Sequence, residues 1–253
     1  MSDTHLSAKS RERERDVVTF LKHLTGRAGS LLINGDLFDF WFEWRTVVPR
    51  GHYRTLAALA ELHDAGVEVL MLAGNHDCWG GSELTDDVGV RYHVGRWTGS
   101  VAGWMTEVEH GDGLRVVEDR RYRMLRSVLR HTLSVKAFRL LHPDLGSRLA
   151  TRVSHTSRSH AARDGGEGLR SAAFQMLRDS PAPELVILGH SHVPALERAP
   201  GGAIYANAGS WLEAPTFLLV TPLRIELRRW RESAESDLLH ALDRFAEKAP
   251  AKP

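Results

Sequence analysis

The chain has 253 residues, of which 42% are hydrophobic, and a formal net charge of +1. This is enough apolar material for the core of one large catalytic domain, and the near-neutral balance favours neither nucleic acid nor an obligate protein partner. The single cysteine, Cys78, excludes an internal disulfide and fits a reducing, cytoplasmic environment. The N-terminus lacks the apolar core of a signal peptide, and no apolar run approaches the roughly 20 residues of a membrane-spanning helix.

The first part of the chain alternates helical and strand patterns. Residues 10–25 and 51–66 carry apolar side chains at the spacing of one helical face, and each pattern stops at a glycine. The apolar runs at 30–35 and 67–74 predict buried strands that lead into polar clusters. Such alternation predicts a layered α/β domain with helices on both faces of a sheet, and the loops at the strand ends should carry the chemistry.

The second part of the chain begins with a long helical region. Residues 113–180 show helical periodicity with few strand signals, so we expect a helical cap inserted into a catalytic domain that spans 1–232. Residues 233–253 are expected to form a C-terminal helix and a tail. The remaining strands are expected at 103–110, 184–189, 202–209, 216–221 and 223–230.

Short clusters of carboxylate, amide and imidazole side chains recur along the chain, and at least three of them directly follow an apolar strand. Such donors suit Mn, Fe, Zn or Co, and the absence of cysteine among them argues for an open catalytic site rather than a closed structural one. Asp3 has no strand pattern before it, which suggests that a strand is missing there. The clusters are Asp3-x-His5, Gly35-Asp36-x-x-Asp39, Gly74-Asn75-His76-Asp77, His110-Gly-Asp112 and Gly189-His190-Ser-His192.

This ordered series resembles the signature of the calcineurin-like metallophosphoesterases, and the resemblance extends from residue 3 to residue 192. Any single cluster is more often a turn or a helix cap, but the ordered set is specific. The resemblance implies a sandwich of two mixed β-sheets flanked by helices, with the site on loops at one edge. It also implies that Asp36 bridges two cations. The remaining ligands would be Asp3, His5 and His192 for the first cation and Asn75, His110 and His190 for the second.

The implied chemistry is hydrolysis of a phosphate ester or anhydride by metal-bound hydroxide, with manganese as the expected metal. His76 follows the ligand Asn75 and would donate a proton or hydrogen bond to the leaving oxygen, while Asn75 would also contact substrate. Asp39 or Asp77 would orient His76 or a ligand. Asp112, Asn207 and Ser210 either line the pocket or belong to turns.

The predicted cap is basic and apolar at once. From 115 to 163 it carries twelve arginines and lysines against three acids, interleaved with leucine, valine and phenylalanine. Such a surface suits an anionic lipid substrate, or peripheral contact with an anionic membrane on its inner face. Equally, it suits a lid that packs its apolar side on the core and leaves the arginines in solvent.

Within the superfamily, the chain is most similar to the UDP-2,3-diacylglucosamine hydrolases of lipid A synthesis. The similarity includes residues 110–112, Asp119, Tyr122-x-x-Leu-Arg126 and the helical insertion. It implies cleavage of a lipid-nucleotide pyrophosphate into UMP and lipid X, with Tyr122, Arg126 and Arg158 in contact with substrate. Two departures are His76, where the best-known members have arginine, and the lysine-free segment 154–160.

Two other hypotheses remain open at this stage. The metal core alone does not encode the leaving group, so a nucleotide phosphodiesterase or pyrophosphatase with a soluble substrate would look the same. A metal-free scaffold that keeps the fold is also conceivable, although all seven predicted ligand positions carry side chains that can bind metal.

Overall fold

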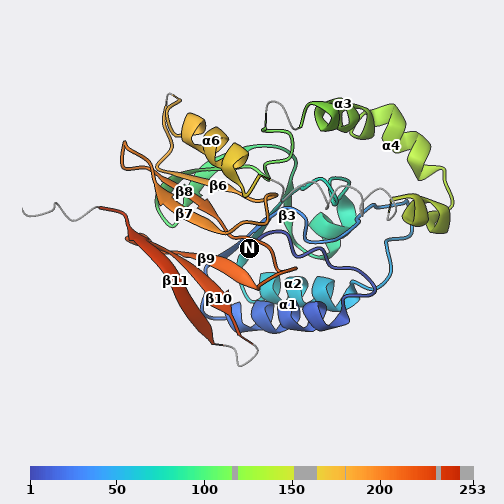
Figure 1. The fold of residues 1–253 in the computed structure, drawn as a ribbon. Coiled ribbons are helices and arrows are strands. Elements are labelled where there is room, and N and C mark those ends of the chain that lie inside the picture. The colour runs from blue at the N-terminus through green and yellow to red at the C-terminus, as the bar shows by residue number, and fades with distance from the viewer. Residues whose placement is uncertain (116–118, 151–163, 180, 232–234, 246–253) are drawn as a thin grey trace, which may run out of the picture.

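Two helices and a parallel sheet form one half of the molecule (Figure 1). The computed structural model describes residues 1–115, 119–150, 164–179, 181–231 and 235–245. Helices α1 (Arg11–Leu24) and α2 (Tyr53–Asp64) pack together over the three-stranded sheet β1 (Ser30–Asn34), β2 (Glu68–Leu72) and β3 (Arg91–His93). The apolar stripes of both helices explain this, because Val17, Phe20, Leu21, Leu59 and Leu62 are all buried.

The other half contains a mixed sheet of five strands in the order β4-β5-β6-β8-β7. Strands β5, β6 and β8 are parallel, while β4 and β7 pair antiparallel at the two edges. Helix α6 (Glu167–Met176) covers β6 and β8. The strands are β4 (Trp97–Val101), β5 (Trp104–Val108), β6 (Leu185–Leu188), β7 (Ala195–Arg198) and β8 (Ile204–Asn207).

A hydrophobic layer joins the two halves. Leu72 of β2 lies in the same buried cluster as Val108 of β5 and Ile187 of β6, and Ile225 also belongs to it. The succession of helices, sheet, sheet and helix confirms the predicted α/β fold, in which mixed sheets are sandwiched between helices. Hydrogen bonding divides the described strands into three sheets.

The predicted C-terminal helix is wrong. Residues Ser236–Asp243 form strand β11, which pairs antiparallel with β10 (Arg224–Trp230), and β10 pairs with β9 (Thr216–Val220). The apolar spacing of this segment fits a helix, but β10 offers an unpaired edge whose backbone groups need partners. A register shift between Leu227 and Arg228 bends this ladder.

The helical insertion is shorter than predicted. Helices α3 (Arg120–Leu129) and α4 (Thr132–Arg139) arch away from the sheets at one end of the molecule (Figure 1). Helix α6 also falls within the predicted range 113–180, yet it buries Leu169, Ala173 and Met176 against the mixed sheet. It therefore belongs to the sandwich, and the arch is confined to the part before it.

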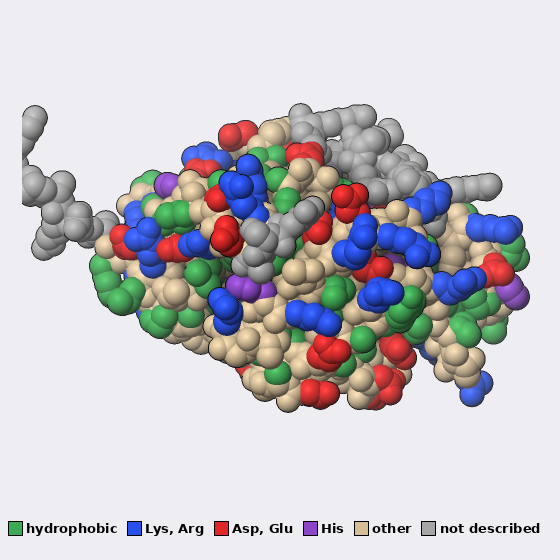
Figure 2. Space-filling model, turned by 90° about the horizontal axis from the view of Figure 1, so that it is seen from below, with side chains coloured by type: hydrophobic (Ala, Val, Ile, Leu, Met, Phe, Trp, Pro, Cys, Tyr) green, Lys and Arg blue, Asp and Glu red, His purple; other side chains and the backbone are tan. Residues whose placement is uncertain are grey.

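The arch leaves apolar side chains in solvent. Leu133 and Leu140 are 68% and 88% exposed. On the face seen from below, Lys and Arg side chains lie scattered among hydrophobic and acidic ones (Figure 2). No helix within the described residues is both long and apolar enough to cross a bilayer.

Candidate metal centre

Five of the seven predicted ligands lie in loops at the carboxyl ends of strands, whereas Asp3 and His5 lie before the first helix. Asp36 follows β1, Asn75 and His76 follow β2, and His110 follows β5. His190 and His192 follow β6, which lies beside β5 in the mixed sheet. Because the carboxyl ends of parallel strands meet at the same edge, segments far apart in the sequence converge here.

Left-handed backbone conformations concentrate at these loops. Non-glycine residues seldom adopt positive φ, and such strain persists only where surrounding structure enforces it. Among the described residues six do so, and all but Ala102 are predicted ligands. These are Asp3 (52°), His5 (46°), Asp36 (53°), His190 (63°) and His192 (62°).

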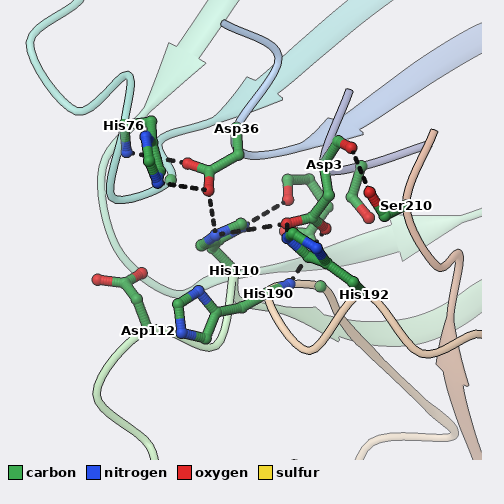
Figure 3. Close-up of polar contacts among 12 residues, drawn as sticks. Asp3, Asp36, His76, His110, Asp112, His190, His192 and Ser210 are labelled. Atoms are coloured by element: carbon green, nitrogen blue, oxygen red, sulfur yellow. Dashed lines mark hydrogen bonds and ion pairs between the residues drawn. The ribbon is translucent and has the colours of Figure 1, made fainter. Parts of the chain in front are cut away.

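Three buried groups of side chains could hold a metal ion, and His5, Asp39 and His76 form one of them. The other two stand next to each other (Figure 3). The first contains Asp3, His5 and His192; His192 Nε2 lies 3.4 Å from Asp3 Oδ1 and 3.2 Å from His5 Nε2. The second contains Asp36, His110 and His190, with His110 Nε2 3.3 Å from Asp36 Oδ2.

Asp36 lies between the two clusters. Its Oδ2 is 3.7 Å from His5 Nε2 in the first cluster and 3.3 Å from His110 Nε2 in the second. Its Oδ1 accepts a hydrogen bond from the backbone N–H of His76. One oxygen is therefore fixed by the protein, and the other faces both groups of imidazoles.

Several polar atoms in these clusters are buried without a hydrogen-bond partner among the described residues. They are Asp3 Oδ1, Asn75 Oδ1, His5 Nδ1 and His110 Nε2. A buried polar atom that lacks a partner is costly, and its presence in a native fold calls for a water or an ion. Carboxylate and amide oxygens together with imidazole nitrogens make a suitable donor set for divalent transition metals, so these residues fit the predicted metals.

The orientation of His110 leaves one ring nitrogen available for a metal. Its Nδ1 lies 2.8 Å from the carbonyl oxygen of Asn34, which can only accept, so Nδ1 carries the proton. When the ring is neutral, as a metal ligand must be, its Nε2 lone pair faces Asp36. This carbonyl contact is the kind of outer interaction that fixes the tautomer of a metal-binding histidine.

Glycines permit this close approach. A Cβ at Gly74 would lie 2.0 Å from Asp36 Oδ1, and one at Gly35 would lie 2.4 Å from His110 Nδ1. Both glycines precede predicted ligands in the motifs, so any larger residue would displace a ligand itself.

Charge in the cluster shifts the pKa values of its members. Burial alone would lower the pKa of His110, but the carboxylates of Asp36 and Asp3 outweigh it and raise the pKa well above its ordinary value. Burial would raise the pKa of Asp36, yet the imidazoles of His110 and His76 hold it well below its ordinary value. Burial lowers the pKa of His190 to about 4. The buried carboxylates of Asp3 and Asp36 thus favour a positively charged group beside Asp36.

His76 lies at the edge of the clusters. Its Nδ1 is 3.0 Å from the carbonyl oxygen of Asp39, which can only accept, so Nδ1 carries a proton. Its Nε2 lies 3.9 Å from Asp36 Oδ2. The ring thereby presents Nε2 toward the site.

Asp77 binds the two ligand loops together. Its Oδ1 accepts from the backbone N–H groups of Asp36 and Gly74, and its Oδ2 accepts from those of Leu37 and Phe38. The side chain is completely buried. Asp77 therefore orients the backbone that carries Asp36, rather than a side chain.

The side chains of Asn207 and Ser210 also donate hydrogen bonds to backbone carbonyl oxygens. Asn207 Nδ2 donates to Gly189 O at 3.0 Å, and Ser210 Oγ donates to Asp3 O at 2.9 Å. Both are buried. They support the loops of His190 and Asp3 as turn residues.

Asp112 joins the metal centre to the arch. Its Oδ2 accepts a 2.7 Å hydrogen bond from Tyr122 Oη and lies 3.4 Å and 3.3 Å from the guanidinium groups of Arg126 and Arg130. Arg130 was not predicted, although residues four apart share one helical face and the series 122, 126, 130 signals it. Of the residues predicted to bind substrate, Tyr122 and Arg126 contact Asp112, and Arg158 lies outside the described residues.

An apolar pocket of about 280 Å³ opens between the metal centre and the arch. Asn75 and His76 border it on one side, and Leu125, Leu129 and Phe138 border it on the other. The aromatic residues that follow Asp36 in the sequence have two different positions. Phe40 and Phe42 line this pocket, whereas Phe38 and Trp41 pack in the core.

Buried clusters of carboxylate and imidazole side chains, on an α/β sandwich and beside a pocket, are typical of a metal-dependent hydrolase. Residues 1–194 match the calcineurin-like phosphoesterase family. The chain belongs to that family and is a metallophosphoesterase, a metal-dependent hydrolase.

Curated relatives share a narrower name. The chain is 35% identical over 161 residues to a UDP-2,3-diacylglucosamine hydrolase of Porphyromonas gingivalis, over 62% of each chain. It is 27% identical to the hydrolase of the same name from Pectobacterium carotovorum, over 90% of this chain and 96% of that protein. Among solved structures, Vps29 of Entamoeba histolytica with zinc is similar over 96% of this chain and 97% of its own, with 13% identity and a TM-score of 0.44.

Proposed function

We propose that this metallophosphoesterase holds two divalent cations, with manganese as the expected metal. Asp3, His5 and His192 would hold the first, and Asn75, His110 and His190 the second. Asp36 would contact both. The observation that carries this assignment is the pair of adjacent buried clusters, in which Asp3 Oδ1, Asn75 Oδ1 and His110 Nε2 lack partners among the described residues.

Two such cations, when bound, supply Lewis-acid stabilisation of phosphoryl charge and a nucleophile derived from water. The protein's own contribution is to fix the donors. The carbonyl of Asn34 sets the His110 tautomer, and the Asp77 carboxylate holds the loop of Asp36. Preorganised groups of this kind need little rearrangement during reaction.

His76 is proposed to assist the leaving group. Its Nδ1 is held by the Asp39 carbonyl, so a second proton on the imidazolium would reside on Nε2, the nitrogen that faces Asp36. From that position it can donate to a leaving oxygen bound beside the cluster.

The proposed substrate is UDP-2,3-diacylglucosamine, cleaved at its pyrophosphate to UMP and lipid X. The similarity to UDP-2,3-diacylglucosamine hydrolases and the apolar pocket beside Asn75 and His76 both support it. Acyl chains match such a pocket, and exposed leucines among the basic residues of the arch fit peripheral contact with an anionic membrane. In this arrangement Tyr122 and Arg126 act by fixing α3 on Asp112, which shapes the pocket wall.

A comparison of two substrates tests the proposal. UMP release from UDP-2,3-diacylglucosamine and aryl release from a bis-aryl phosphodiester are measured with added manganese, with Asp36→Asn as the background. A preference for the lipid nucleotide supports the proposal. A preference for the generic ester, or for a soluble nucleotide in the absence of detergent, would replace it with a soluble phosphodiesterase or pyrophosphatase.

A further inference from the structure

A second pocket, of about 690 Å³, borders the metal centre next to the apolar one. It is lined by His5, by segments 6–10 and 47–50, and by Pro143, Asp144 and Ser147. The two pockets share Asp39 and Phe40 in their walls, but His5 of the first cluster lines only the second pocket, and Asn75 and His76 line only the apolar one. A molecule with its phosphorus at the metal centre therefore has room in both pockets, and the volume lies within the usual range of roughly 300–1,000 Å³ for small-molecule sites.

The second pocket carries positive charge that the first lacks among its described lining residues. Lys9, Arg13 and Arg50 line it, together with the acids Asp39 and Asp144. Arg13 donates to the carbonyl oxygens of Thr4 and His5 at 3.1 Å, which ties it to the backbone of the first cluster. Neither Lys9 nor Arg50 forms an ion pair with any described residue, so both remain available to an anion.

The N-terminal end of helix α2 also faces this pocket. Its N-cap residue, His52, lines the pocket wall, and the His52 side chain makes no capping hydrogen bond to the backbone of the helix. The first turn of the 12-residue helix contains no acidic residue. The unpaired N–H groups at such an end favour anions.

His52 provides a separate indication of a polar ligand. It is only 4% exposed, packs against the rings of Phe38 and Trp41, and its Nδ1 has no partner in the described part of the chain. A buried nitrogen left without a partner in a pocket wall marks a place for a hydrogen-bonding group.

We propose that this second pocket binds the nucleoside monophosphate half of the substrate, while the apolar pocket takes the lipid half. The inference deepens and rests on the proposed function. The phosphate would lie at the metal centre, Lys9, Arg50 and the start of α2 would donate to the ribose and base oxygens beyond it, and the apolar wall of Val47, Val48 and Pro49 would meet the base ring. The polar nucleotide half would thus lie in the basic pocket and the apolar lipid half in the apolar pocket.

The test uses UMP as the probe, with the double variant Lys9→Ala/Arg50→Ala. UMP affinity is measured by calorimetry with and without manganese, and as competitive inhibition of bis-aryl phosphodiester hydrolysis. We expect UMP to bind at least tenfold more weakly to the double variant, with kcat and KM for the small diester within twofold of wild type. Arg45→Ala is the matched control, because Arg45 is exposed in the same loop but lies outside the pocket lining.

Inorganic phosphate separates the pocket from the metal centre. Its inhibition should be equal in the wild type and the double variant, because it occupies only the metal centre. Unchanged UMP affinity in the double variant, or an equal loss in Arg45→Ala, would overturn the inference even if the lipid nucleotide is cleaved. Loss of the proposed function itself would show as no lipid-nucleotide turnover above Asp36→Asn, and calorimetry would still test the pocket.

Discussion

The strongest structural prediction concerns Asp77→Asn. The carboxylate accepts four backbone N–H groups on its two oxygens, two of them at 2.8 Å. Asparagine has one acceptor oxygen, so its NH₂ group must face two of these donors. A buried donor without a partner costs about 1–3 kcal/mol, which gives a loss of about 4 kcal/mol for two.

A loss of that size should be plain in unfolding experiments. At about 2–4 °C per kcal/mol for a chain of this size, the Tm should fall by about 8–16 °C. Urea unfolding at pH 8 is the primary assay, because burial and Asp36 raise the pKa of Asp77 to about 7 and the wild-type side chain is then ionised. Manganese affinity should fall as well, since the affected loops carry Asp36 and Asn75.

The matched control is Asp64→Asn, an exposed residue at the end of α2. It should leave the unfolding free energy within about 0.5 kcal/mol of wild type. If Asp77→Asn were as stable as Asp64→Asn, the assigned role of Asp77 as the common acceptor of the two loops would be refuted.

Three further predictions follow from particular contacts. Burial lowers the pKa of His52 from 6.5 to about 4, so its stabilising contribution is complete above pH 6.5 and is lost as the pH falls toward 4. Between pH 7 and pH 5 the wild type should therefore lose about 2 kcal/mol more unfolding free energy than His52→Phe, and parallel pH profiles would contradict this. Tyr122→Phe removes the hydrogen bond to Asp112, worth about 1.5 kcal/mol, and should reduce hydrogen-exchange protection in α3 about tenfold without changing β6; equal protection would show that Asp112 does not anchor the helix. Arg126→Ala should raise the KM for the lipid nucleotide while leaving the KM for a bis-aryl phosphodiester unchanged, and a parallel rise in both would assign Arg126 to the metal centre instead.

The side chains that the structure brings together in buried clusters can be found in the sequence because they stand in short local motifs. Four of the five predicted clusters follow a strand of the structure, and the ends of those strands meet at one edge, whereas Asp3 and His5 have no strand before them. The positive φ values of Asp3, Asp36 and His190 were not predictable, since histidine and aspartate adopt them only where tertiary contacts enforce them. The carbonyl of Asn34 that orients His110 was also hidden, because backbone acceptors leave no mark in a sequence.

The errors in the predicted fold arise where tertiary context decides. The segment that forms β11 has helical spacing, and only the free edge of β10 makes it a strand. The short edge strands β3 and β4 were missed because they are half exposed and lack an apolar run. Helix α6 was assigned to the cap because periodicity shows that a helix has an apolar face, without showing which surface that face covers.

The most direct test of the central claim is the number of manganese ions bound per chain. After equilibrium dialysis, elemental analysis should find two ions in the wild type and one in each of His190→Ala and His192→Ala, with all three proteins folded by circular dichroism. A wild type that binds none, or variants that bind the same number as the wild type, would contradict a two-metal centre formed by these residues.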